Sequence, residues 1–337
     1  MRRPSTATVV LTHVGLCLFT IAALYPVLWV VKMALTPGQA FVMGASPIPT
    51  TVSPQNFIDV IGTPNVWGVT QLLTLLAVIN GGVFLVLRGM LSWGRESALT
   101  VGFAAGVLVI ALMHLAGVNP ATEGWLFGQQ LFNSLVVASA TSIVGVTLSA
   151  SAAYGLSRWD FPGRDQGMNA FLVTQMFPGV VMAIPLYILL DVMHLLDSMT
   201  GLVLVYATTA VPFSVWTLKG YFDSIPFALE EAAMLDGASR WMTFTEIILP
   251  LARPALAVTG LFSFMTAWNE FILAATFMGD PRSFTLPVVL QAYVSDYGTE
   301  WGHFAAGAIV VSMPVMTLFF ALQRHFVEGL TAGGVKG

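Results

Sequence analysis

Long uncharged stretches recur along the whole chain. Stretches of about 20 residues without Asp, Glu, Lys or Arg are long enough to cross a bilayer as a helix. They cover residues 9–31, 66–87, 97–118, 131–156, 167–190, 199–218 and 304–323. An eighth stretch, residues 254–279, contains one charged residue, Glu270, and ends before Asp280. The pattern predicts eight transmembrane helices, because lipid offers the backbone no partners and the stretches lack the alternation of a membrane β-barrel.

The composition agrees with a protein that lies mainly in a bilayer. Hydrophobic residues make up 56% of the 337 residues and charged residues only 9%, whereas a soluble protein carries about 25% charged residues. The predicted fold class is therefore all-α, a polytopic membrane protein in contact with membrane lipid, and no nucleic-acid partner is expected. A single cysteine, Cys17, excludes an internal disulfide.

The positions of the basic residues predict the side of the membrane on which each loop lies. With the N-terminus inside, all of the 13 lysines and arginines except Lys32 and Arg282 lie in the cytoplasm. Basic residues gather in the cytoplasmic loops of membrane proteins, so we expect a multi-pass protein with both termini cytoplasmic. The longest cytoplasmic loop is then residues 219–253, and the longest outer loops are residues 32–65 and 280–303.

The sequence lacks motifs for nucleotide, metal or covalent chemistry. A phosphate-binding loop needs a Gly-Lys pair, and none occurs. The 5 histidines show no metal-ligand spacing, and no G-x-S-x-G turn is present for a nucleophilic serine. Charged residues within spans are typical of ion-coupled carriers, but only Glu270 lies in a span here. The pattern favours a non-catalytic pathway for a neutral solute with an external energy source.

Residues 221–250 predict two short helices joined by a turn. Good helix formers follow Pro226, Gly237 supplies a left-handed residue that ends the first helix, and Ser239 caps the second helix. Pro250 is expected to stop the second helix before the next span. Four apolar residues share one face of that helix by their spacing, namely Trp241, Phe244, Ile247 and Ile248.

The predicted pair of helices has the features of a docking surface. Ala232 and Ala233 leave room for close packing, and Glu230, Glu231 and Asp236 offer carboxylates to a partner. The alternative is an ordinary amphipathic hairpin at the membrane interface.

The same segment resembles the EAA loop of ABC importer permeases. The match consists of Glu231-Ala232-Ala233, Gly237, Ile247 and Leu249-Pro250 at fixed offsets. Further segments are similar to the second membrane subunit of maltose-type carbohydrate importers, in the same order along the chain: residues 133–135, 153–154, 158–163, 175–178, 219–222, 301–306 and 329–337. The chain thus resembles a type I permease of the carbohydrate family.

The resemblance implies a division of labour in the bacterial inner membrane. An extracytoplasmic sugar-binding protein delivers the sugar, this chain and a second permease subunit form the pathway, and a homodimer of ATPase subunits holds ATP and magnesium. This chain would contain no cofactor, metal or catalytic site. It would import maltose, maltodextrin or a similar oligosaccharide. A stand-alone secondary carrier or channel for a neutral solute is the alternative.

The resemblance also implies contact residues. The ATPase-coupling residues would be Glu230, Glu231, Ala232, Ala233, Asp236, Gly237, Leu249 and Pro250. A second ATPase contact would be the tail residues Gly333, Gly334, Val335, Lys336 and Gly337, for which a disordered tail is the alternative. A loop that contacts the sugar-binding protein would contain Tyr293, Ser295, Asp296 and Tyr297, although aromatic rings also anchor chains at the membrane interface.

Three polar residues of the spans are candidates for the substrate pathway, namely Gln175, Asn269 and Glu270. Their amide and carboxylate groups suit sugar hydroxyls, and hydrogen bonding between helices is the alternative. Pro178 and Pro185 are expected to bend the fifth span.

The family pattern has six helices, so residues 66–118 add an extra two-helix hairpin. We expect residues 1–65 to form the first helix and an outer loop, and residues 119–337 to form the permease core with its coupling loop at 221–250. The hairpin enters and leaves on the outer side, which preserves the topology of the later spans, and a lipid-facing position is expected.

Overall fold

The computed structural model describes residues 6–44, 46–62, 125–295 and 298–334. Contacts divide the chain into two compact units, which we call unit 1 and unit 2. Unit 1 contains Met1–Thr63 and Val289–Met313, and unit 2 contains Pro64–Val288 and Pro314–Gly337. The extra hairpin predicted at residues 66–118 lies outside the described residues.

In unit 1 a long helix contacts a short one. Helix α1 (Thr6–Leu35) packs against α2 (Gln55–Ile61). Most of α1 is exposed, and burial begins near its end, at Lys32, Met33 and Ala34. The rest of the unit comes from the end of α14 (Leu286–Ala292), β1 (Val294–Ser295), β2 (Gly298–Thr299) and the start of α15 (Trp301–Gly334). The two short strands pair antiparallel.

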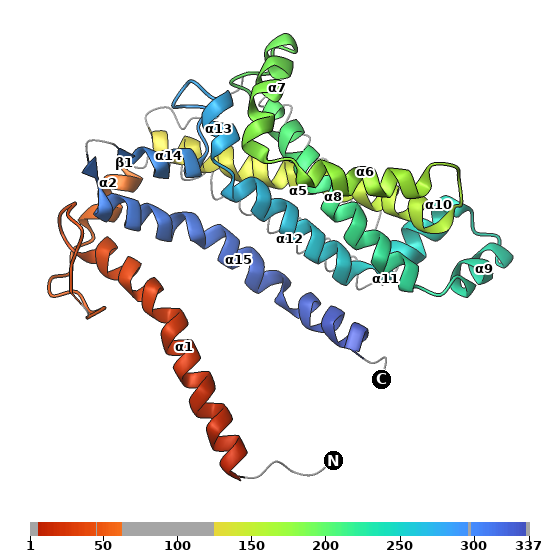
Figure 1. Ribbon diagram of the computed structural model, residues 1–337, viewed down its shortest axis with the longest axis horizontal. Helices are drawn as coiled ribbons and strands as arrows, with labels where there is room; N and C mark the ends of the chain where they lie inside the picture. The colour runs from red at the N-terminus through yellow and green to blue at the C-terminus, as the bar shows by residue number, and fades with distance from the viewer. Residues whose placement is uncertain (1–5, 45, 63–124, 296–297, 335–337) are drawn as a thin grey trace. The chain divides into compact units, whose positions relative to one another are not determined.

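Unit 2 is built on three helices that pack against one another (Figure 1). They are α5 (Leu126–Arg158), α8 (Met199–Ser224) and α12 (Arg253–Asn269). Small and hydroxyl residues line the contact of α5 with α12. A Cβ added at Gly145 would lie 3.4 Å from Ser263 Oγ, and Ser142 Oγ donates to the Gly260 carbonyl oxygen at 2.8 Å. Such residues let helix backbones approach closely in lipid.

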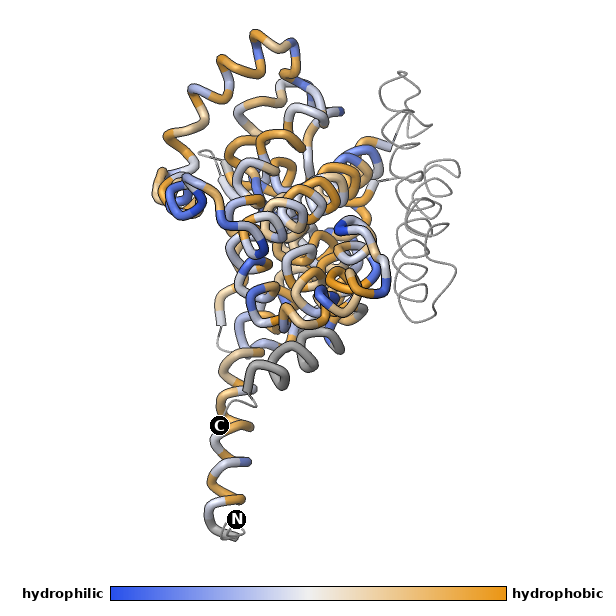
Figure 2. The backbone as a smooth tube through the Cα atoms, turned by 90° about the vertical axis from the view of Figure 1, so that its right-hand side faces the viewer, coloured by the Kyte–Doolittle hydropathy of each residue, from blue (hydrophilic) through white to orange (hydrophobic). Residues whose placement is uncertain are grey.

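The prediction of an all-α membrane protein is confirmed. In the described part of the chain, four helices are long and apolar enough to cross a membrane, and two bent helix pairs bring the total to as many as 6. The four helices and the pair at residues 164–192 match predicted spans. The pair at residues 240–269 begins in the predicted cytoplasmic loop and overlaps the predicted span 254–279 only at residues 254–269. Hydrophobic residues, coloured orange in Figure 2, occupy much of the described helices. Many of their side chains are exposed. Apolar residues all round a helix are typical of membrane spans.

Two of the predicted spans are broken. Helices α6 (Arg164–Met176) and α7 (Gly179–Val192) form an angle of 102°. Pro178 lacks an amide donor and holds Phe177 in extended backbone, whereas α7 continues through Pro185. The second break lies at Glu270, which is extended between α12 and the short helix α13 (Ile272–Phe277).

Candidate functional site

The segment predicted as the coupling loop folds as helix, turn and helix. It contains α9 (Ala228–Leu235), α10 (Arg240–Met242), the π-helical segment η1 (Thr243–Ile248) and α11 (Leu249–Leu251). We call residues 228–251 the α9–α11 hairpin. Gly237 has a φ of 86°, and the Ser239 hydroxyl accepts a hydrogen bond from the Met242 amide at 3.2 Å. The left-handed turn and the helix cap predicted at Gly237 and Ser239 are confirmed.

The second helix differs from the prediction in which residues it buries. Phe244 and Ile248 are buried as predicted and Ile247 is half-buried, but Trp241 is 70% exposed. The π-helical hydrogen bonds of η1 place more residues in each turn than an α-helix does. The wider turn rotates Trp241 away from the side that Phe244 and Ile248 bury.

The predicted stop of this helix at Pro250 is wrong by one residue. Leu249 and Pro250 lie inside α11, both half-buried, and the helix ends at Leu251 with Ala252 as its C-cap. Pro250 follows η1 directly, where the α-helical hydrogen-bond pattern is already interrupted and its missing amide is tolerated. The next helix, α12, starts at an angle of 79°.

Helix α9 has an outer side and an inner side. Four exposed residues share the outer side at spacings of three and four residues, namely Ala228, Glu231, Ala232 and Leu235. Glu230 and Ala233 lie on the opposite side and are buried. The two alanines predicted to form one packing surface therefore face in different directions. Asp236 and Gly237 in the following turn are exposed.

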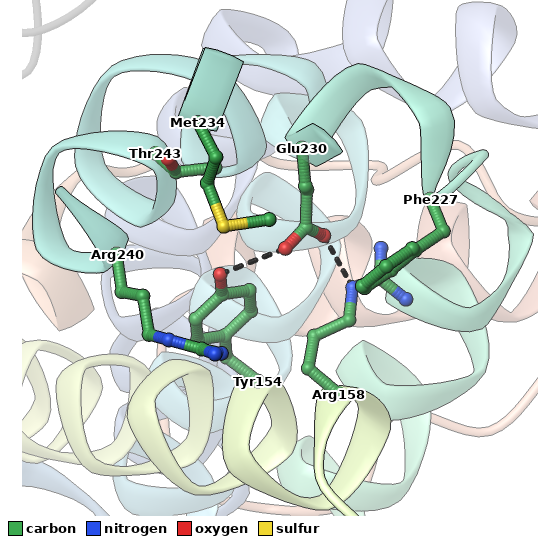
Figure 3. A pocket seen from close by; sticks show the side chains of 7 residues that line it. All are labelled: Tyr154, Arg158, Phe227, Glu230, Met234, Arg240 and Thr243. Carbon is green, nitrogen blue, oxygen red and sulfur yellow. Dashed lines mark hydrogen bonds and ion pairs between the residues drawn. The ribbon is translucent and has the colours of Figure 1, made fainter. Parts of the chain in front are cut away.

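Glu230 does not expose its carboxylate as predicted, and its contact with an ATPase stays a prediction. Its side chain is 5% exposed and forms an ion pair with Arg158, the last residue of α5 (Figure 3). The other carboxylate oxygen accepts a hydrogen bond from the Tyr154 hydroxyl at 2.9 Å. Arg158 also donates to the carbonyl oxygen of Ile225, directly after α8, at 3.2 Å. Glu230 thus joins the α9–α11 hairpin to α5 from inside the protein.

Aromatic side chains pack between the hairpin and the end of α5. Tyr154 stacks on Phe244 of η1 with ring centroids 4.6 Å apart and meets Trp159 edge-on at 5.3 Å. The Arg240 guanidinium lies over the Trp159 ring at 5.6 Å from its centroid. These rings bury apolar area and add favourable stacking and cation–π contacts. Tyr154 and Phe244 belong to a buried cluster that α5, α8, η1 and α12 share.

Two of the predicted pathway residues are exposed. Gln175 lies near the end of α6, and its Nε2 donates to the Thr209 carbonyl oxygen of α8 at 3.3 Å. This bond is of the kind expected from the alternative, hydrogen bonding between helices. Asn269 is the last residue of α12 and is exposed. Contact of either side chain with a substrate stays a prediction.

The third pathway candidate, Glu270, fills the break between α12 and α13. Its carboxylate accepts a hydrogen bond from the Tyr206 hydroxyl of α8 at 2.8 Å. It also accepts bonds from the amides of Leu273 at 2.9 Å and Ala274 at 3.2 Å. A carboxylate in this position satisfies amides that the start of a helix leaves without partners. Glu270 therefore shapes the break, and its role in the pathway stays a prediction.

The loop predicted to contact a receptor is described in part. Tyr293 precedes β1, which contains Ser295, while Asp296 and Tyr297 lie outside the described residues. The Tyr293 ring lies 5.6 Å from the ring of His303 in α15. Contact with a receptor stays a prediction.

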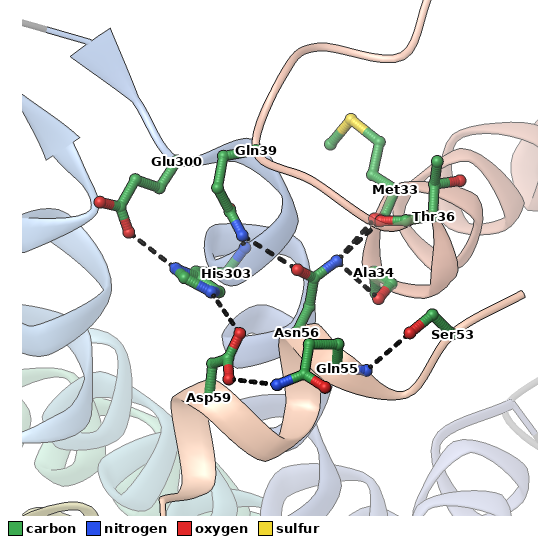
Figure 4. A network of polar contacts seen from close by, with 10 residues as sticks. All are labelled: Met33, Ala34, Thr36, Gln39, Ser53, Gln55, Asn56, Asp59, Glu300 and His303. Carbon is green, nitrogen blue, oxygen red and sulfur yellow. Dashed lines mark hydrogen bonds and ion pairs between the residues drawn. The ribbon is translucent and has the colours of Figure 1, made fainter.

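Sequence reasoning missed a polar network in unit 1 (Figure 4). Asn56 of α2 is 1% exposed. Its Nδ2 donates to the carbonyl oxygens of Ala34 at 3.1 Å and Thr36 at 2.9 Å, and its Oδ1 accepts from Gln39 Nε2 at 3.0 Å. The amide supplies a donor to carbonyls at the end of α1. A lone asparagine in a long loop gives no sequence signal for such a role.

His303 extends the network in unit 1. Its Nδ1 lies 2.7 Å from Glu300 Oε2, and its Nε2 lies 3.3 Å from Asp59 Oδ2. Burial, together with the charges of Glu300 and Asp59, raises the pKa of the Tyr293 phenol. These contacts link α2 to the start of α15.

The predicted contact at the C-terminus lies largely beyond the described residues. The backbone of Gly333 and Gly334 forms the end of α15. Val335, Lys336 and Gly337 lie outside the described residues, so their contact with an ATPase stays a prediction.

The fold and the site define an all-α membrane protein that carries an exposed helical hairpin tied to its long helices. The model of the family described as binding-protein-dependent transport system inner membrane component matches residues 145–331. The chain belongs to this family. It is therefore a non-catalytic inner membrane component of a transport system.

Named relatives agree with this assignment. The chain is 39% identical over 222 residues to a putative ABC transporter permease protein of Streptomyces antibioticus, a match that covers 66% of this chain and 97% of the relative. It is 38% identical over 218 residues to the maltodextrin transport system permease protein MdxG of Bacillus subtilis strain 168, covering 63% of this chain and 78% of the relative.

A solved structure has a similar fold. It belongs to a bacterial ABC transporter involved in the import of the acidic polysaccharide alginate and is 19% identical to this chain. The TM-score is 0.66, over 97% of this chain and 100% of that chain. This similarity concerns the fold only.

Proposed function

We propose that this chain is a permease subunit of an ABC importer for sugars and that it transports maltodextrin or a similar oligosaccharide. The family supports the transport system, and the maltodextrin permease among the relatives supports the substrate class. The partners are an extracytoplasmic sugar-binding protein, a second permease subunit and a pair of ATPase subunits that hold ATP and magnesium.

The two-sided construction of α9 carries the proposal. Its inner side is held through Glu230, while Glu231, Ala232 and Leu235 are exposed on the outer side, Leu235 to 88%. An exposed leucine beside a small residue and a carboxylate gives a partner an apolar contact with a charge next to it. An ATPase subunit binds this outer side, and its movement shifts α5 and α8 as rigid bodies.

The basic residues support a cytoplasmic position for the hairpin. Arg158 and Arg240 both line the pocket between the hairpin and α5, and such residues are more frequent on the cytoplasmic side. In this orientation both termini are cytoplasmic and the β1–β2 segment lies outside, where it meets the sugar-binding protein.

Copurification and uptake test the function. The chain is solubilised with a mild detergent from its native membrane, and the proteins that copurify are identified by mass spectrometry. The complex is then placed in liposomes, and uptake of radiolabelled maltodextrin is measured with and without ATP and the sugar-binding protein. We expect an ATPase, a second permease and a receptor to copurify, and uptake to require ATP. Uptake by the chain alone without ATP would favour the secondary carrier instead.

A pair of matched variants tests the docking side. Leu235→Glu places a charge on the outer side of α9, whereas Phe161→Glu places one at another exposed apolar residue, 46% exposed, in the loop after α5. Burying a leucine contributes about 1.5–3 kcal/mol, so Leu235→Glu should lower copurification of the ATPase at least about tenfold. Phe161→Glu should change it little. An equal loss in both variants would contradict docking at α9.

A further inference from the structure

Arg158 and Glu230 form the most deeply buried ion pair in the described part of the chain, with side chains 7% and 5% exposed. Removing two charges from water is unfavourable, and an apolar contact of similar size often stabilises a fold equally well. The remaining ion pairs of the described residues each contain a side chain that is at least 40% exposed. The burial of this pair therefore points to a role besides stability.

The geometry ties one carboxylate to two long helices. One oxygen of Glu230 pairs with Arg158 Nε, and the other accepts the Tyr154 hydroxyl at 2.9 Å. Tyr154 and Arg158 are four residues apart and lie on the same side of α5. Through Nη2, Arg158 also holds the carbonyl oxygen of Ile225 at the end of α8 at 3.2 Å.

We propose that Arg158 and Glu230 are positioning residues that transmit movement of α9 to α5 and α8. This role rests on the function proposed above and deepens it, because the ATPase binds the outer side of α9 and the ion pair carries the displacement inward. An apolar contact can slide at little cost, whereas separating this pair leaves two buried charges without partners. The helices on either side of the pair therefore move together.

Glu230→Gln tests the role in the reconstituted complex, because glutamine has nearly the same shape and no charge. Two quantities are measured: copurification of the ATPase, and sugar molecules imported per ATP hydrolysed. The matched control is Asp223→Asn, which removes the partly exposed ion pair with Lys219 within α8, at 2.7 Å, and keeps a side-chain oxygen that can accept the Ser157 hydroxyl of α5. We expect Glu230→Gln to assemble normally and to import about tenfold less sugar per ATP, and Asp223→Asn to change this ratio less than about twofold.

Variants of the partner residue separate positioning from simple support of the fold. Arg158→Gln removes the charge, and Arg158→Lys keeps the charge without the planar guanidinium. We expect the ratio of import to hydrolysis to fall about tenfold in Arg158→Gln and to stay within about threefold of wild type in Arg158→Lys. If Arg158→Gln does not assemble, the exchanged pair, Arg158→Glu with Glu230→Arg, should recover both assembly and ratio. A supporting role alone would lower assembly and leave the ratio unchanged.

The outcomes are distinguishable. If assembled Glu230→Gln and Arg158→Gln complexes import as much sugar per ATP hydrolysed as the wild type, the proposed role of the ion pair is overturned. The proposal that the chain belongs to a sugar importer would be unaffected. Recovery of assembly without recovery of the ratio in the exchanged pair would overturn the role of the ion pair as well. A wild-type complex without ATP-driven uptake of maltodextrin would overturn both proposals.

Discussion

Each unit of the molecule uses a buried polar side chain to tie a short helix to a long one, and the two ties differ in charge. In unit 2 the side chain is Glu230 of α9, which is paired with Arg158. In unit 1 it is Asn56 of α2, a neutral amide bonded to several backbone carbonyls. Loss of the opposite charge leaves an unpaired buried charge, whereas a neutral amide loses individually weaker bonds. Loss of one partner of the ion pair should therefore release α9 in a single step. Helix α2 is held by several hydrogen bonds, each of which contributes less.

The largest effect is expected from Arg158→Met, which leaves Glu230 buried without its partner. Such a change costs about 3–5 kcal/mol. Amide hydrogen exchange in residues 228–235 should therefore become more than about a hundredfold faster. Exchange in α2, residues 55–61, serves as the internal control and should not change. A similar rise in both helices would mean that the pair stabilises the whole chain and not the hairpin.

The next largest effect is expected from Asn56→Leu. The carbonyl oxygens of Ala34 and Thr36 lose their donor, at a cost of about 1–3 kcal/mol. Exchange in residues 55–61 should become faster while residues 228–235 stay unchanged. Gln55→Leu is the matched control, since Gln55 lies in the same helix and is exposed. Equal effects of the two variants would contradict the importance of the buried amide.

An effect of similar size is expected from Gly302→Ala, within unit 1. A Cβ at this position would lie 2.5 Å from the Gly38 carbonyl oxygen and 2.7 Å from Asn56 Nδ2. Overpacking of this kind costs about 1–3 kcal/mol, and displacement of the amide should lower the melting temperature in detergent. Gly220→Ala in α8 is the control, because its Cβ would meet nothing within 4 Å. A melting temperature that falls equally in both variants would argue against the close contact.

The smallest effect is expected from Asp59→Asn. The Asp59 side chain is 40% exposed, and polar contacts between partly exposed groups contribute less than about 1 kcal/mol. The pKa of Tyr293 should nevertheless fall, because the change removes a negative charge that opposes phenolate formation. A spectrophotometric titration, corrected with the Tyr293→Phe variant, measures this shift. An unchanged pKa would leave burial and Glu300 as its causes.

Local signals in the sequence predict much of the fold. The spans follow from runs of apolar residues, and the turn at Gly237 and the cap at Ser239 follow from requirements of single backbone positions. The breaks were harder to predict. Pro178 marks one of them, but Pro185, also a proline, lies inside a continuous helix.

The direction of the polar side chains could not be predicted from the sequence. Glu230 and Glu231 are adjacent and chemically alike, yet one is buried and the other exposed. The difference depends on Arg158 and Tyr154, which lie more than 70 residues earlier in the chain. The partner of Glu270 on α8 is likewise remote, 64 residues away. Only tertiary structure brings these groups together.

Because of the π-helical segment η1, the direction of the outer side of α9 depends on the number of residues in the hairpin as well as on their identity. An α-helix turns by about 100° per residue. Deleting one residue between Thr243 and Ile248 would restore α-helical spacing and rotate α9 and α10, which precede η1, by about that angle around the helix axis. Trp241 would turn inward, and the outer side of α9 would point elsewhere. A one-residue deletion in η1 would therefore change the direction in which the outer side of α9 faces, without altering any residue of that side.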